Sequence, residues 1–123
     1  FNKVRNHFGM SRVSQAAALA ALADQAYLTD TVARVAAARA RIGEIAAANG
    51  LAALPSAANF VAIDCGRDGD YARRVLEALI ARDIFVRMPF VAPQDRCIRV
   101  SCGPDPELDL FAEALPGALH AAS

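Results

Sequence analysis

The chain has 123 residues, 55% of them hydrophobic, with 13 basic and 13 acidic side chains and a formal net charge of zero. This length suits one domain that can bury a real core, and the balanced charge argues against a nucleic-acid-binding surface. No run of about 18 uninterrupted apolar residues occurs, so we expect no transmembrane helix and no membrane partner.

The N-terminal part of the chain is predicted to be a loop followed by long helices. Residues 1–10 lack the apolar region of a signal peptide and do not begin with methionine, which indicates an entry loop in a fragment or a processed chain. An alanine-rich run follows, which Ser11 or Ser14 could cap, and Thr29 and Asp30 offer a second cap. Residues 11–49 are therefore predicted to form two long helices or one kinked helix, ended by Asn49 and Gly50.

The rest of the chain is predicted to alternate short strands with helices. The expected strands cover 58–65, 84–87 and 96–103, and the expected helices cover 71–82 and the residues from 105 onward. Asp70 and Asp105 are the expected caps, and Pro116 is expected to kink or end the last helix. Residues 58–119 thus predict helices layered on a small sheet, an α+β domain.

The cysteines and histidines give no reactive site. Cys65, Cys97 and Cys102 are an odd number without Cys-x-x-Cys spacing, so we expect reduced thiols packed as small apolar residues in a cytoplasmic protein. His7 and His120 have no further ligand at metal spacing and no triad partners, so we expect neither a metal site nor a hydrolase triad.

The only lysine, Lys3, lies in the predicted entry loop. A Schiff-base role would need burial or a cationic neighbour to lower its pKa, so a solvated loop lysine is the expectation.

Arg87 and Arg99 are the candidate functional residues. Arg87 ends one predicted strand and Arg99 lies in the next, so pairing of these strands could bring both guanidinium groups to one anion. A planar guanidinium binds a carboxylate or phosphate through two parallel hydrogen bonds. The structural alternative is that both arginines form ordinary surface ion pairs with Asp83, Asp95 or Glu107.

The order of several segments resembles the C-terminal part of class I/II aminotransferases, in particular the histidinol-phosphate aminotransferase group. The resemblance covers essentially the whole chain and rests on these segments, in this order: NKVRNHFGMSRVSQAAALAALAD, LPSAANFVAID, IFVRMPF and CIRVSCGPDPELDLFAEALPGAL. It implies that residues 1–123 are the C-terminal small domain of an α/β enzyme of the pyridoxal-phosphate-dependent transferase fold.

The resemblance also implies roles for individual residues. Arg99 matches the arginine that binds the substrate α-carboxylate, and Arg87 matches a second arginine that helps to hold the substrate phosphate. Asn59 is expected to be structural and to hold the turn before its strand. The lysine that bonds covalently to pyridoxal 5′-phosphate, and the other cofactor-binding residues, are expected upstream of Phe1, so no residue of this chain is assigned to catalysis or cofactor binding.

The implied activity is amino-group transfer between an amino acid, or a substrate like histidinol phosphate, and a 2-oxo acid, in a cytoplasmic homodimer. The chain alone is expected to be inactive. Three alternatives remain open: a related pyridoxal-phosphate-dependent decarboxylase, a stand-alone α+β module that binds amino acids, and a dimerisation domain that uses the alanine-rich helix.

Overall fold

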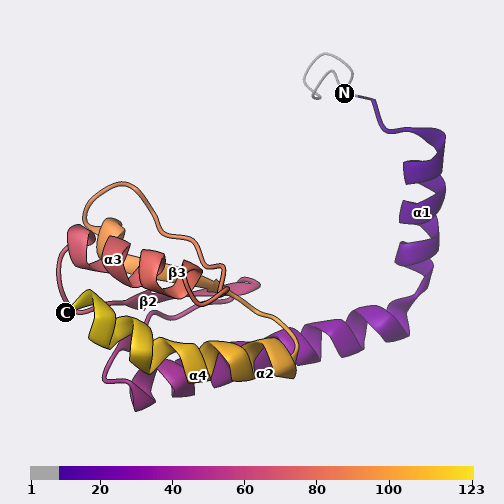
Figure 1. Cartoon of the computed structure of the whole chain (residues 1–123). Helices are drawn as coiled ribbons and strands as arrows, with labels where there is room; N and C mark the ends of the chain where they lie inside the picture. Colours follow the sequence, from indigo (N-terminus) through magenta and orange to yellow (C-terminus); the bar gives the residue numbers. More distant parts are fainter. Residues whose placement is uncertain (1–8) are drawn as a thin grey trace. The chain divides into compact units, whose positions relative to one another are not determined.

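The computed structural model describes residues 9–123, which form helices and one small sheet (Figure 1). The chain divides into two compact units, 1–32 and 33–123, which we describe separately. Lys3, His7 and most of the expected entry loop lie outside the described residues.

The first unit contains α1 (Arg12–Ala23) and the first turns of α2 (Gln25–Ala48). The Ser11 hydroxyl caps α1 by accepting the backbone N–H of Ser14 at 3.1 Å, as one of the two sequence-based alternatives proposed. At the start of α2, the Asp24 carboxylate accepts the N–H of Tyr27 at 3.0 Å. The predicted cap at Thr29 and Asp30 was therefore wrong, because Asp24 already caps this helix.

Helix α2 ends where the asparagine–glycine pair predicted. Gly50 has a φ of +70°, a conformation that glycine adopts without a steric penalty. The N–H groups of Gly50 and Leu51 donate to the carbonyls of Ala47 and Ala46, both at 3.0 Å. This pair of hydrogen bonds is a Schellman motif, and it turns the chain from the helix into the sheet.

The second unit contains a three-stranded antiparallel sheet in the order β1 (Ala52–Ala53), β2 (Phe60–Asp64), β3 (Cys97–Ser101). Strand β1 was not predicted, because two alanines carry no alternating pattern. The register pairs Val61 with Val100 and Ile63 with Ile98. Because side chains alternate across a strand, these four buried residues share one face of the sheet.

That face of the sheet packs against helices in a single hydrophobic core. The core joins the four strand residues to buried side chains of α2, of α3 (Gly69–Ile80) and of α4 (Asp105–Ala122). The largest fully buried side chains are Ile42, Ile63, Leu79, Ile98, Leu115 and Val75. The predicted α+β layering of helices on a small sheet is confirmed.

Some helix boundaries differ from the prediction. Asp68, and not Asp70, caps α3, because its carboxylate accepts the N–H of Tyr71 at 2.9 Å. Pro104 precedes α4, so Asp105 is the first helical residue rather than the cap. Pro116 was expected to kink or end this helix, but α4 does not end there and continues to Ala122. Leu115 and Ala118, on either side of Pro116, are both fully buried, so continuing the helix keeps its apolar face in the core.

The predicted strand over 84–87 is reduced to one bridge, formed by Arg87 with Arg99. A short 3-10 helix, η1 (Gln94–Arg96), leads from the intervening loop into β3. Within residues 9–123, no helix is both long and apolar enough to cross a membrane.

Candidate anion-binding site

Arg87 and Arg99 lie directly opposite each other on neighbouring antiparallel segments. The N–H of Arg87 donates to the carbonyl of Arg99 at 3.1 Å, and the N–H of Arg99 donates to the carbonyl of Arg87 at 2.6 Å. Residues paired in this way project their side chains from the same face of the sheet. The prediction that the two segments would pair side by side is therefore confirmed.

This face is the one turned away from the hydrophobic core. Phe60, Ala62 and Arg99 are partly exposed, and Arg87 is exposed. Arg99 stands directly opposite Ala62 in the register of β2 and β3. The face therefore offers an apolar floor with two guanidinium groups that solvent or a ligand can reach.

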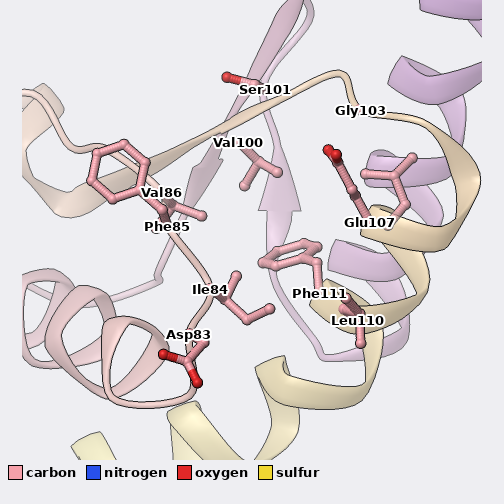
Figure 2. A pocket seen from close by; sticks show the side chains of 11 residues that line it. Asp83, Ile84, Phe85, Val86, Val100, Ser101, Gly103, Glu107, Leu110 and Phe111 are labelled. Atoms are coloured by element: carbon pink, nitrogen blue, oxygen red, sulfur yellow. The ribbon is translucent and has the colours of Figure 1, made fainter.

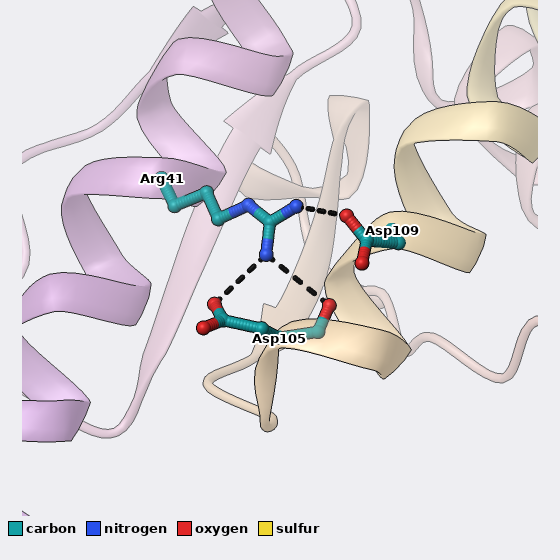
Figure 3. A network of polar contacts seen from close by, with 3 residues as sticks. All are labelled: Arg41, Asp105 and Asp109. Carbon is teal, nitrogen blue, oxygen red and sulfur yellow. Dashed lines mark hydrogen bonds and ion pairs between the residues drawn. The ribbon is translucent and has the colours of Figure 1, made fainter.

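The two positive charges have no carboxylate partner within residues 9–123. Like charges directly opposite each other on a sheet are destabilising. The structural alternative predicted from the sequence was that each arginine forms an ion pair with Asp83, Asp95 or Glu107. The ion pairs in the described part of the chain join Arg41 to Asp105 and Asp109 (Figure 3), and Arg96 to Asp64. Neither Arg87 nor Arg99 uses an acidic side chain there, so both remain available to an external anion.

Asp64 lies on the same strand as Phe60 and Ala62, but its charge is already compensated. Burial alone would raise the pKa of this carboxyl, yet the Gly66 N–H and the Arg96 guanidinium together bring the pKa below its ordinary value. Each of the two donors lies 2.8 Å from Asp64 Oδ1. The Asp64 carboxylate, at the end of β2, is therefore bound to Arg96 and not to Arg87 or Arg99.

Phe60 adds an aromatic element to the site. The Arg99 guanidinium carbon lies 4.7 Å from the centroid of the Phe60 ring, within the range of a cation–π interaction. No functional role was predicted for Phe60 from the sequence. The available signal was alternation, because Phe60 sits on the strand face opposite to Val61 and Ile63, but the partner on the next strand depends on a register that sequence alone does not give.

A separate pocket of about 260 Å³ lies between the segment 83–86, the end of β3 and α4 (Figure 2). Most of its lining is apolar, and its charged side chains are Asp83 and Glu107. Neither Arg87 nor Arg99 lines it. Because two carboxylates repel an anion, this pocket does not suit an anionic ligand, and the arginine pair remains the better site.

The other singled-out residues lie outside this site. The backbone carbonyl of Asn59 accepts the N–H of Cys102 at 2.9 Å, which holds the start of β2 through the main chain. Cys65, Cys97 and Cys102 are free thiols; Cys65 and Cys97 are buried and Cys102 is half-buried. His120 is exposed on α4.

Comparison with known proteins identifies the family. The family described as "Aminotransferase class I and II" matches residues 1–115. The chain belongs to this family. Its members depend on pyridoxal phosphate, so the resemblance seen in the sequence and the cofactor that it implied are both confirmed.

Several similar proteins are histidinol-phosphate aminotransferases. The chain is 36% identical over 118 residues to histidinol-phosphate aminotransferase 1 of Cupriavidus pinatubonensis, covering 96% of this chain and 31% of that protein. It is 37% identical over 116 residues to the enzyme of Citrifermentans bemidjiense, covering 93% and 32%. The chain therefore spans about a third of the length of the curated aminotransferases that it matches.

A solved structure also resembles the whole chain. The crystal structure of histidinol-phosphate aminotransferase from Sinorhizobium meliloti, in complex with pyridoxal-5′-phosphate, matches with a TM-score of 0.93 and 56% identity. The match covers 100% of this chain and 34% of that one. The α+β unit described above is thus a piece of the pyridoxal-phosphate-dependent aminotransferase fold.

The described residues of this aminotransferase piece do not suit covalent attachment of the cofactor. Pyridoxal phosphate supplies an electron sink for amino-group transfer and is held by a lysine amine. Residues 9–123 contain no lysine. What they offer is a pair of arginines suited to carboxylate or phosphate, so we derive no chemical step through the cofactor from these residues.

Proposed function

We propose that this chain is the substrate-anion-binding part of an aminotransferase that moves an amino group between an amino acid, or a substrate like histidinol phosphate, and a 2-oxo acid. The observation that supports this best is the bridge between Arg87 and Arg99, which holds two cations on one sheet face without acidic partners in residues 9–123. A sheet bears the cost of such a like-charged pair most simply where anionic groups of a ligand compensate the charges.

In this proposal, the two arginines bind and orient the substrate and do not react with it. Arg99 binds the α-carboxylate and Arg87 the distal anion, as their matches in the family suggest. Holding both ends fixes the direction of the reacting Cα–H bond, and positioning of this kind contributes several kcal/mol in favourable cases.

The proposal extends to the context of the chain. We infer that residues 1–123 are the C-terminal small domain, that the remaining parts of the enzyme carry the lysine, and that this chain alone is inactive. A homodimer in the cytoplasm fits α1, whose Val13, Leu19 and Leu22 are each at least 69% exposed, and the three free thiols.

Anion binding can be measured on the 123-residue chain itself. We expect inorganic phosphate to shift the backbone amide resonances of Arg87 and Arg99 saturably in a nitrogen-15 NMR titration. Arg99→Gln and Arg87→Gln should each weaken phosphate binding at least about tenfold, because a charge-assisted hydrogen bond contributes roughly 1.5–3 kcal/mol.

The matched control is Arg73→Gln, which removes one charge from an exposed arginine of α3. Its phosphate affinity should equal that of the unmodified chain. Equal weakening by all three substitutions would mean non-specific attraction to positive charge, and the proposed site would then be wrong.

A further inference from the structure

We propose that Phe60 is a positioning residue, whose ring sets the orientation of the Arg99 guanidinium for the anion. This inference rests on the proposed function, because it assigns a role to a side chain that touches the anion-binding arginine. The observation that supports it is the distance of 4.7 Å between the guanidinium carbon of Arg99 and the centroid of the Phe60 ring.

The register of the sheet explains why Arg99 reaches Phe60. Arg99 lies directly opposite Ala62, and Phe60 lies opposite Ser101, so Phe60 is the diagonal neighbour of Arg99 on the same face. Diagonal neighbours on a sheet are about 7–8 Å apart, a span that a long side chain bridges. Because the Ala62 side chain is only a methyl group, Arg99 has room to lean over β2 toward the ring.

The main chain at Phe60 is held on both sides, so the backbone that carries the ring is fixed. The Ser56 hydroxyl donates to the Phe60 carbonyl at 2.6 Å and accepts the Ala58 N–H at 3.1 Å. The Cys102 N–H donates to the carbonyl of the preceding residue, Asn59, at 2.9 Å. Phe60 therefore lies where the turn that Ser56 closes meets the first residue pair of β2 and β3, Phe60 with Ser101.

A ring is a suitable support because it leaves the hydrogen-bonding capacity of the arginine untouched. A guanidinium has five N–H donors in its plane and no acceptor, and a cation–π contact is made through the face of the ring. Arg74 offers a contrast, because it also lies near a ring, that of Tyr71, but its Nε donates to the Ala122 carbonyl at 2.9 Å. Within residues 9–123, no side-chain hydrogen bond competes for Arg99.

The test compares three variants of the 123-residue chain in the same phosphate titration. Phe60→Leu keeps an apolar side chain but removes the ring, and we expect it to weaken phosphate binding about threefold to fivefold. Phe60→Tyr keeps the ring and should restore the affinity. Phe90→Leu is the matched control, since Phe90 is an aromatic residue that is 81% exposed, and it should leave the affinity unchanged.

A second readout separates positioning from a general loss of structure. The Nε–H resonance of Arg99 should carry a ring-current shift, which Phe60→Leu removes and Phe60→Tyr keeps. The amide resonances along β2 and β3 should stay close to those of the unmodified chain. An unchanged Nε–H shift in Phe60→Leu would overturn the inference, whether or not phosphate binds.

The two proposals fail in different ways. If the unmodified chain does not bind phosphate, the proposed anion site is wrong, while the Nε–H shift still decides whether the ring orients Arg99. If the unmodified chain binds phosphate and Phe60→Leu binds it equally well, the anion site stands and the role of Phe60 is wrong.

Discussion

Cys65 is the buried thiol that directly follows β2, and its side chain is in the core. Burial is the main cause that raises its pKa, from 9.0 to about 11. A thiolate is the nucleophilic form of cysteine, and each unit of pKa changes its fraction about tenfold well below the pKa. At pH 8, Cys65 should therefore contain about 100-fold less thiolate than an unperturbed thiol.

Alkylation by iodoacetamide, followed by peptide mass spectrometry, measures this difference. In the folded chain, we expect Cys65 to react at least about 100-fold more slowly at pH 8 than in urea, and to accelerate as the pH approaches 11. Stability should respond in the same window: the unfolded thiol ionises first, so the free energy of unfolding decreases between about pH 9 and pH 11. Equal alkylation rates of Cys65 in the folded and unfolded chains would contradict this.

Sequence patterns predicted part of the site at the level of single residues. The pairing of Arg87 with Arg99 followed from two expected strands joined by a short loop, and the structure has this pair. The role proposed for both arginines came from the family resemblance and is still to be tested. Phe60 was missed because it is a diagonal neighbour of Arg99 on the sheet. Such a contact can be predicted only when the register of β2 and β3 is known.

Helix α3 ends in a motif that contains an unusual residue. Asp83 has a φ of +61°, a left-handed conformation that disfavours residues other than glycine. Its N–H donates to the Ile80 carbonyl and the Ile84 N–H donates to the Leu79 carbonyl, both at 3.0 Å. This arrangement is a second Schellman motif, with aspartate in the place where glycine is most common.

Asp83→Gly should therefore stabilise the chain, by roughly 0.5–1 kcal/mol, because glycine adopts this conformation without the steric cost. Urea unfolding followed by circular dichroism measures the change. Asp83→Ala is the control, since it removes the negative charge near the end of the helix but keeps the Cβ atom. A gain in Asp83→Ala as large as that in Asp83→Gly would assign the effect to charge and not to the backbone.

At the scale of elements, the end of α2 was predicted correctly, whereas features that depend on tertiary packing were not. The prediction that α2 ends at Asn49 and Gly50 was correct, because it depends on local backbone preference. Pro116 was expected to kink or end its helix, but the burial of Leu115, Ala118 and Ala122 favours continuation. The segment 84–87 has strand propensity, yet only Arg87 finds a partner, because the chain before it follows the turn at Asp83.

A polar link joins α2 and α4 of the second unit, two helices that are distant in sequence. Arg41 of α2 donates to the carboxylate of Asp105 at 2.8 Å and also to that of Asp109, both in the first turns of α4 (Figure 3). The Arg41 Nη1 donates in addition to the Asp105 carbonyl at 3.2 Å. One guanidinium thus fixes the start of α4 against the middle of α2, while the core fills the space between these helices and the sheet.

Arg41→Met should lower the urea midpoint of the chain, because it keeps the apolar stem but removes the link. The loss should be smaller at about 1 M salt than at low salt, since screening weakens the interaction of partly exposed charges. Arg73→Met, at an exposed position on α3, serves as the matched control and should shift the midpoint less. A salt-independent loss in Arg41→Met would mean that packing of the stem, and not charge, joins the two helices.

The single bridge at Arg87 gives the two arginines unequal mechanical support. Arg99 belongs to a strand that pairs along its whole length with β2, so its backbone is braced from two directions. Arg87 is tied to the sheet by two main-chain hydrogen bonds at one residue, and the segments before and after it leave the ladder. Amide hydrogen exchange should accordingly be faster around Arg87 than in β3. Under the proposal that this pair binds an anionic ligand, we expect Arg99 to hold one end in a fixed place and Arg87 to follow the other end, so that anions of different length are held without remodelling the sheet.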